Sequence, residues 1–186
     1  MNTSDGDFAV KTAFGPGLME QFTDVYNKLR DSFPPDQFPY LLPQQWVVKS
    51  EFEGLEKAAI VQRWVNGKPL GKITVSDFQY NPHLADELDA FLRIARKMDS
   101  KPDILSSDDI LTSDQGHAVL IATDVLLPWG EKGRHMAGVI RSLINAANDG
   151  QPISYTKAFN DLYKQTYLNQ PLGQLLRRAI DRRMTR

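Results

Sequence analysis

Apolar residues recur along this chain with two different spacings, one typical of helices and the other of strands. Positions 18–29, 84–95 and 136–147 carry apolar side chains every third or fourth residue, as amphipathic helices do. The segments 58–65 and 70–75 are instead rich in β-branched residues. Because these helices and strands do not alternate regularly, the pattern predicts an α+β fold, with a small antiparallel sheet packed with about five helices and a helical C-terminus.

The dipeptide Asn66-Gly67 separates the two β-rich segments. Asn-Gly is favoured in two-residue hairpin turns because both central residues of such a turn have positive φ. We therefore expect a β-hairpin that turns at Asn66-Gly67, in a meander to which residues 46–48 add a further strand. Roughly the first twelve residues precede this pattern and are expected to fray.

Two other stretches fit neither spacing cleanly. Residues 118–127 form either a buried strand or a short helix, and the flanking Gly116 and Pro128 favour the strand. Residues 33–43 hold three aromatic residues and four prolines, which predicts a rigid coil packed on the core. The same loop, together with the region of Trp129, is an alternative candidate for an adhesive surface that binds a protein partner.

Length and composition limit the class of protein. A chain of 186 residues, 41% of them hydrophobic, has the size of one domain, so we expect a single domain over 1–186. The absence of cysteine excludes disulfides, thiolate zinc sites, iron–sulfur clusters and cysteine nucleophiles. The N-terminus lacks the pattern of a signal peptide, and no apolar run is long enough to span a bilayer. These features predict a cytoplasmic protein with no membrane partner.

Charge is distributed unevenly along the chain. The net charge is −1 overall, but residues 157–186 hold seven Lys or Arg against two Asp. Such asymmetry between segments indicates a surface for an anionic partner.

The sequence contains no pattern of a known catalytic or cofactor site. No two of the histidines, His83, His117 and His135, are spaced i, i+4, so they do not predict a metal site on one helical face. The acidic residues of 103–114 lack the closing Glu of a calcium loop. We therefore predict no catalytic residue, no metal and no cofactor. An enzyme site assembled in space near His117, Asp124 or His135 is an alternative.

The clearest functional pattern lies at the C-terminus. The chain reads Asp-Gly-Gln-Pro-Ile-Ser-Tyr over 149–155 and Gln-Pro-Leu-Gly-Gln-Leu-Leu-Arg-Arg over 170–178. Together these stretches resemble the helix-turn-helix module of alkylguanine-DNA alkyltransferase-like proteins and of other winged-helix proteins. The resemblance covers 149–183 and suggests a subdomain over 149–186. The alkyltransferases' Pro-Cys-His-Arg is absent, so the resemblance implies DNA binding without repair chemistry.

The resemblance also implies that a helix over 172–183 enters a groove of the duplex. Its nucleic-acid-binding side chains, which lie off the apolar stripe, would be Gln174, Arg177, Arg178, Arg182 and Arg183. The opposing interpretation is a solvated basic helix, because the helix dipole also favours cations near a C-terminus.

The sequence thus predicts a non-catalytic, nucleic-acid-associated or regulatory accessory protein that binds through its basic C-terminal helices. One alternative is a protein-interaction or assembly factor that uses the loop at 33–43 and the region of Trp129. The other is the enzyme described above.

Overall fold

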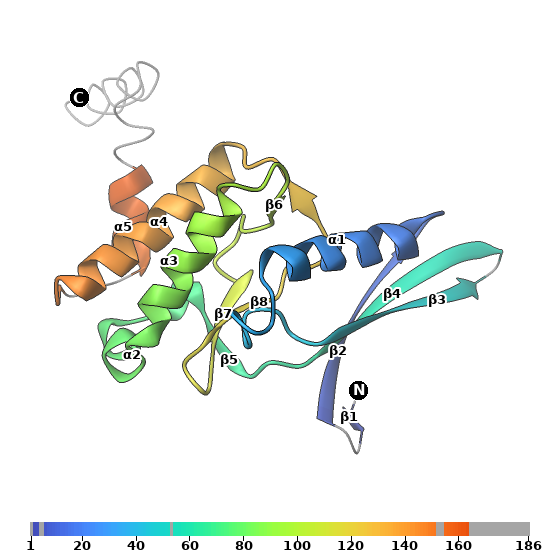
Figure 1. The fold of residues 1–186 in the computed structure, drawn as a ribbon, viewed down its shortest axis with the longest axis horizontal. Coiled ribbons are helices and arrows are strands. Elements are labelled where there is room, and N and C mark those ends of the chain that lie inside the picture. The colour runs from blue at the N-terminus through green and yellow to red at the C-terminus, as the bar shows by residue number, and fades with distance from the viewer. Residues whose placement is uncertain (1, 4–5, 53, 152–154, 164–186) are drawn as a thin grey trace, which may run out of the picture.

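The computed structural model describes residues 2–3, 6–52, 54–151 and 155–163 (Figure 1). It confirms the α+β class, with helices packed against small antiparallel sheets. The helices are α1 (Leu18–Ser32), α2 (Val75–Tyr80), α3 (His83–Ala95), α4 (Glu131–Asn148) and α5 (Tyr155–Tyr163), with a 3-10 turn η1 at Leu70–Lys72. The strands are β1 (Asn2–Thr3), β2 (Gly6–Phe14), β3 (Gln45–Phe52), β4 (Leu55–Arg63), β5 (Gly67–Pro69), β6 (Lys101–Pro102), β7 (Ile110–Ser113), β8 (Ala118–Leu120) and β9 (Leu126–Leu127).

The elements form two parts that Figure 1 shows side by side. The first, which we call the sheet arm, consists of β2, β4 and β3 with α1 against one face. The second, which we call the helical body, consists of α3, α4 and α5, packed in that order, and the short sheet β5-β7-β8, whose strand β8 contacts α3. In Figure 1 the β3–β4 hairpin extends away from the body. Among the described residues, no helix is long and apolar enough to cross a membrane.

Strand β4 is the centre of the sheet arm and pairs antiparallel with both neighbours, so that Val61 lies opposite Val10 on β2 and Trp46 on β3. Paired residues of such a ladder share a face, and successive residues alternate between faces. The inner face includes Ala58 and Ile60, which are fully buried on the strand that α1 contacts. The outer face carries Val10, Val61 and Trp46.

The core of the helical body forms where α3 and α4 pack together and the end of α1 joins them. The ring of Phe91 on α3 stacks on that of Phe33, with centroids 5.5 Å apart, and both side chains are fully buried. The apolar stripes predicted over 84–95 and 136–147 are confirmed as the buried faces of α3 and α4. Helical periodicity therefore located the core correctly.

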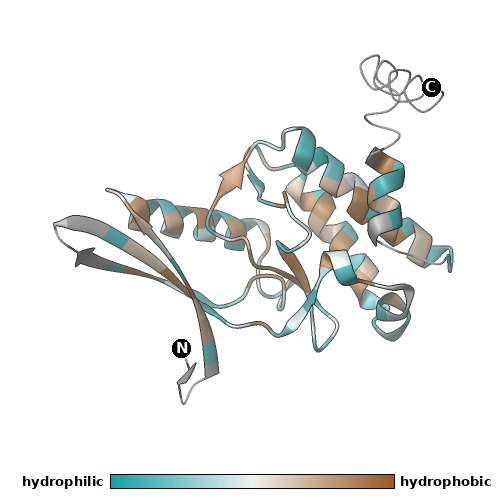
Figure 2. Cartoon of the chain, turned by 180° about the vertical axis from the view of Figure 1, so that it is seen from behind, coloured by the Kyte–Doolittle hydropathy of each residue, from teal (hydrophilic) through white to brown (hydrophobic). Residues whose placement is uncertain are grey.

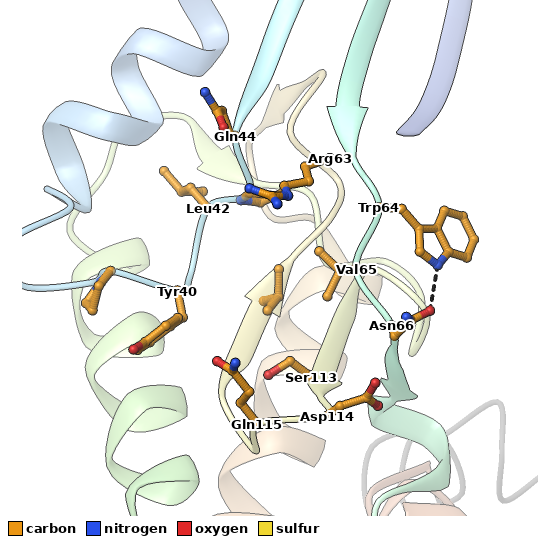
Figure 3. Close-up of a pocket in the computed structure, with 13 residues that line it drawn as sticks. Tyr40, Leu42, Gln44, Arg63, Trp64, Val65, Asn66, Ser113, Asp114 and Gln115 are labelled. Atoms are coloured by element: carbon orange, nitrogen blue, oxygen red, sulfur yellow. Dashed lines mark hydrogen bonds between the residues drawn. The ribbon is translucent and has the colours of Figure 1, made fainter. Parts of the chain in front are cut away.

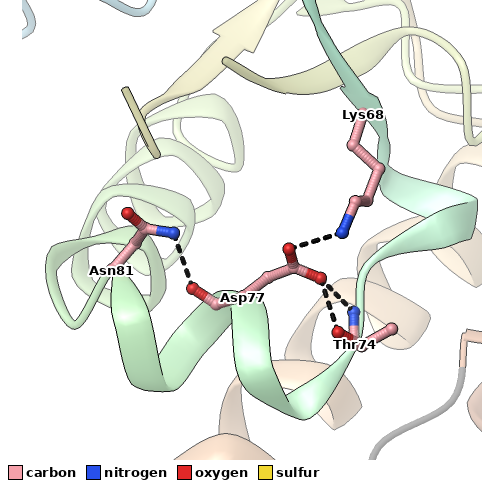
Figure 4. A network of polar contacts seen from close by, with 4 residues as sticks. All are labelled: Lys68, Thr74, Asp77 and Asn81. Carbon is pink, nitrogen blue, oxygen red and sulfur yellow. Dashed lines mark hydrogen bonds and ion pairs between the residues drawn. The ribbon is translucent and has the colours of Figure 1, made fainter. Parts of the chain in front are cut away.

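A polar network fixes the start of α2, a helix that the sequence pattern did not predict (Figure 4). One carboxylate oxygen of Asp77 accepts hydrogen bonds from the Thr74 amide and hydroxyl at 2.6 and 2.7 Å, and the other accepts from Lys68 Nζ at 2.6 Å. Burial opposes ionisation of Asp77, but these hydrogen bonds and the Lys68 charge outweigh it and hold the pKa of Asp77 below its ordinary value.

The predicted Asn-Gly hairpin is corrected. Strands β3 and β4 form the long hairpin, which turns at Gly54 with φ +75°. Gly67 does not have a positive φ, and it begins β5, which pairs with β7 and not with β4. A Cβ on Gly67 would lie 2.5 Å from the carbonyl oxygen of Thr112, so this glycine allows two strands to approach closely.

Two further predictions are changed by strand pairing. The N-terminal residues expected to fray contain most of β2, which pairs with β4 from Phe8 to Phe14. The strand favoured over 118–127 is present as two short pieces, β8 and β9, which belong to different sheets. In both cases long-range pairing, which periodicity does not report, decided the outcome.

Candidate functional site

The outer face of the sheet arm is apolar and exposed. Val10, Phe14, Trp46 and Val48 lie on it with exposed fractions of 43, 56, 44 and 47%. Figure 2, coloured by hydropathy, shows apolar residues on the strands of the arm as well as in the helical body. A contiguous exposed apolar patch on a folded domain marks an interaction site. This face is therefore the first part of the candidate site.

Aromatic rings lie on both outer strands of this face. Phe8 on β2 meets Trp46 on β3 edge to face, with ring centroids 5.8 Å apart. At the other end of β2, Lys57 Nζ lies 5.4 Å from the centroid of the Phe14 ring, within the range of a cation–π contact. The face thus offers flat, polarisable surfaces with a cation beside one of them.

The charge of the outer face is positive. Among the described side chains on this face of β2, β4 and β3, the charged ones are Lys57 and Arg63, and none is a carboxylate. Within the described part of the chain, the exposed guanidinium of Arg63 has no hydrogen-bond or ion-pair partner. Lys11, on the inner face, differs because its Nζ binds Asp124 and the Ile121 carbonyl, each at 2.9 Å. Lys11 therefore links the arm to the body, whereas Arg63 is available to a ligand.

A cleft of about 500 Å³ adjoins the arm where the chain leaves β4 (Figure 3). In Figure 3 the Arg63 side chain extends toward Leu42 and Gln44, whereas the Trp64 side chain points to the opposite side, beside Asn66. The indole of Trp64 donates a hydrogen bond of 2.8 Å to Asn66 Oδ1. The cleft is lined by Pro39, Tyr40, Leu42, Pro43, Gln44, Arg63, Trp64, Val65, Asn66, Ser113, Asp114, Gln115 and Val119.

The polar part of this lining consists mainly of neutral amides and one carboxylate. Gln44, Asn66 and Gln115 each carry both a donor and an acceptor, and Asp114 is an acceptor. The ring of Tyr40, which is 47% exposed, closes one side. Such a lining can form hydrogen bonds with the edge of a planar polar ring while an aromatic side chain contacts its face.

The three residues of the predicted alternative enzyme site contact different parts of the molecule. His117 Nδ1 lies 2.7 Å from Glu87 Oε1, Asp124 pairs with Lys11, and the ring of His135 meets Phe159 edge to face at 4.9 Å. His117 also has a second ionisable neighbour, His83, and the ring centroids of the two histidines lie 4.4 Å apart.

Part of the predicted adhesive surface is buried, and its role in binding a protein partner stays a prediction. Residues 33–43 do pack on the core, as expected, with Phe33 and Leu41 buried. Trp129 is also buried, and its indole donates a hydrogen bond of 2.8 Å to the Pro102 carbonyl. These side chains pack within the described part of the chain, whereas Tyr40 of the same loop is exposed.

The greater part of the C-terminal prediction lies outside the described residues. Within 149–183 the structure describes 149–151 and α5. The predicted nucleic-acid-binding residues Gln174, Arg177, Arg178, Arg182 and Arg183 are not among them.

Sequence reasoning missed the outer face of the arm because its pattern is weak. A half-buried strand usually alternates apolar and polar residues, but β2 reads Phe-Ala-Val-Lys-Thr-Ala-Phe over 8–14, with two alanines and Lys11 on its inner face. The usable signal was the concentration of large apolar residues at every second position.

Comparisons with known proteins do not identify the chain. No protein-family model matches it, and a search of curated proteins finds no match. Its function is therefore inferred from the chemistry of the arm and the cleft.

Proposed function

We propose that this is a non-catalytic accessory protein that binds single-stranded nucleic acid on the outer face of its sheet arm. The observation that carries the proposal is a sheet face with exposed aromatic rings and two cations but no carboxylate among its described side chains. Proteins bind single strands by stacking the bases on aromatic side chains and contacting the phosphates with basic groups.

The positions of the cations suit an extended ligand. Lys57 and Arg63 lie near opposite ends of β4, six residues apart, which corresponds to about 20 Å along a strand. The rings of Phe8, Phe14 and Trp46 lie on the two flanking strands. A single strand that runs along the face can thus contact both cations while its bases stack on the rings.

The cleft provides a place for one base beside this path. Arg63 belongs both to the outer face and to the cleft lining. A nucleotide whose phosphate contacts Arg63 can place its base against Tyr40, where the amide of Gln115 would meet its polar edge. The cleft would therefore contribute a preference for particular bases, whereas the sheet face would contribute most of the affinity.

The C-terminal arginines would make a second, separate contact with nucleic acid. Binding of duplex DNA through a helix-turn-helix module, as the resemblance over 149–183 implies, would use Arg177, Arg178, Arg182 and Arg183. Lys and Arg outnumber Asp over 157–186, and this excess supports a phosphate contact there. A cytoplasmic location, predicted from the sequence, is compatible with either ligand.

A protein partner is the second candidate function. The observation that favours it is the aliphatic part of the outer face, where Val10 and Val48 are nearly half exposed. Valine side chains do not stack with bases, but they pack well against another apolar surface. A protein partner predicts binding that depends little on salt, whereas phosphate contacts predict steep salt dependence.

The test is fluorescence anisotropy with labelled single-stranded DNA, single-stranded RNA and duplex DNA at low and at moderate salt. The variants are Arg63→Glu with Trp46→Ala, the double reversal Arg177→Glu with Arg178→Glu, and the control Arg93→Glu. Arg93 lies on α3 with an exposed side chain, so its reversal matches the change in charge at Arg63 away from the face.

We expect single strands to bind in a salt-sensitive manner, and the arm variant to lose at least about tenfold in affinity, because stacking on one ring alone contributes about 1–3 kcal/mol. The Arg93 control should bind like the wild type. Loss of duplex binding in the C-terminal variant alone would instead support the helix-turn-helix. Absence of binding to all three nucleic acids at low salt would refute the proposal and leave the protein partner.

A further inference from the structure

A cluster of ionisable side chains joins the start of α3 to the β7–β8 hairpin, apart from the arm. His83 and Glu87 are spaced i, i+4 on α3 and so lie on the same side of the helix. His117 approaches them from the residue before β8, and its Nδ1 lies 2.7 Å from Glu87 Oε1. One nitrogen or oxygen atom from each of the three side chains lies within 4.8 Å of the others.

The cluster is held in place by contacts around it. The second oxygen of Glu87 accepts a hydrogen bond of 2.8 Å from the Ala118 amide. The ring of Tyr40 stacks on that of His117, with centroids 3.8 Å apart and planes inclined by 15°. Metal ligands in proteins are commonly fixed in this way by a surrounding shell of hydrogen bonds and packing.

One ligand atom in the cluster lacks a partner. His83 Nε2 is buried and has no hydrogen-bond partner among the described residues. A buried polar atom without a partner costs free energy. A cation bound between the three side chains would supply that partner.

We propose that His83, Glu87 and His117 bind a divalent transition-metal ion of the Zn²⁺ class. Two imidazoles and a carboxylate are the ligand set that zinc accepts when a fourth position is open to water. Hard cations such as Mg²⁺ and Ca²⁺ prefer oxygen ligands and are disfavoured here. The side chains of His117 and Glu87 are 20 and 28% exposed, and a cavity of about 340 Å³ is lined in part by Glu87, so an ion can enter.

The sequence predicted no metal, because no two histidines are spaced i, i+4 and the acidic run at 103–114 lacks the closing Glu of a calcium loop. The informative spacing is that of His83 with Glu87, and only the fold adds His117. The metal ligands are not residues of the outer face, and the cluster shares with the cleft the residue Tyr40, whose ring stacks on His117.

The test uses metal-free full-length protein and Zn²⁺ or Co²⁺ as the probe, with titration calorimetry and Co²⁺ absorption. The variants are His83→Asn and Glu87→Gln, with Asp86→Asn as the control. Asp86 is an exposed carboxylate that lines the same cavity, so its substitution removes the same charge as Glu87→Gln. Since the chain has three histidines, imidazole NMR signals can be assigned to His83, His117 and His135.

We expect one equivalent of Zn²⁺ to bind, with shifts in the imidazole signals of His83 and His117 but not of His135. Each ligand variant should weaken binding by at least about tenfold, the lower end of the loss reported for removal of supporting groups, and Asp86→Asn should not. Circular dichroism establishes that the variants are folded. Absence of saturable binding, or equal binding by Glu87→Gln and the wild type, would overturn the proposal and identify the Glu87–His117 contact as a structural link between α3 and β8.

Discussion

Large apolar side chains are buried in the helical body but exposed on the outer face of the sheet arm. In the body, Phe91 and Leu92 of α3 are fully buried against α1 and α4. On the outer face of the arm, Phe14, Trp46 and Val48 are about half exposed, although each lies in a well-paired strand. Packing within the chain therefore explains the apolar residues of the body but not those of the arm's outer face. This difference is the reason why we propose a partner for the outer face.

The largest loss of unfolding free energy is expected for a substitution in the core of the helical body. Replacing Phe91 by Ala removes a fully buried ring that stacks on Phe33. Such substitutions leave a cavity and cost about 3–5 kcal/mol of unfolding free energy. Urea denaturation of Phe91→Ala against the wild type measures the loss. A loss of about 0.5 kcal/mol or less, the range of surface substitutions, would contradict the division into a packed body and an exposed face.

A smaller loss of unfolding free energy is expected for a substitution in the polar network that links β5 to α2. Asp77→Asn weakens the capping box with Thr74 and removes the ion pair with Lys68, and loss of a helix cap costs about 0.5–2 kcal/mol. The folded-state pKa of Asp77 lies below its ordinary value, so the stability contributed by its charge is present above the unfolded pKa of about 3.9 and is lost as the pH falls through the folded pKa.

The difference in unfolding free energy between wild type and Asp77→Asn should therefore be largest near neutral pH and shrink below about pH 4. Denaturation curves of both proteins at several pH values provide the measurement. The neighbouring exposed Ser76 offers a control in Ser76→Ala, which should show no such pH dependence. A difference that stays constant with pH would show that the charge of Asp77 contributes nothing.

The smallest effect on stability is expected on the outer face of the arm. Trp46→Ala removes a side chain that is 44% exposed, and surface substitutions of this kind usually change the unfolding free energy by about 0.5 kcal/mol or less. Urea denaturation, run beside Phe91→Ala, tests this. A loss comparable to that of Phe91→Ala would mean that the face stabilises the fold, and the loss of ligand affinity in arm variants would then have a structural cause.

The two regions also differ in how far sequence alone predicted them. Helical periodicity over 84–95 and 136–147 identified the buried faces of α3 and α4, because a helix carries its pattern within one continuous segment. The strand pairing of the arm was predicted poorly. The Asn66-Gly67 signal was misleading because β4 found its partners in β2 and β3, the first of which lies about 50 residues away in the chain.

In the candidate sites too, the local spacing of residues could be read from the sequence, whereas contacts between distant segments could not. The spacing of His83 and Glu87 is a local property of α3 and was readable from the sequence, but the approach of His117 depends on how the β7–β8 hairpin packs against that helix. Likewise, aromatic and basic residues were visible along β2, β3 and β4, whereas their gathering on one exposed face required the register of three strands.

By itself the sequence determined the α+β class, the helices of the core and the absence of thiol chemistry, because these depend on composition and on periodicity within short segments. Only the tertiary structure decided which strands pair, which apolar residues remain exposed and which ionisable groups meet. Those features depend on contacts between segments distant in the chain, and the free energy of such contacts is set by mutual packing that no local pattern encodes.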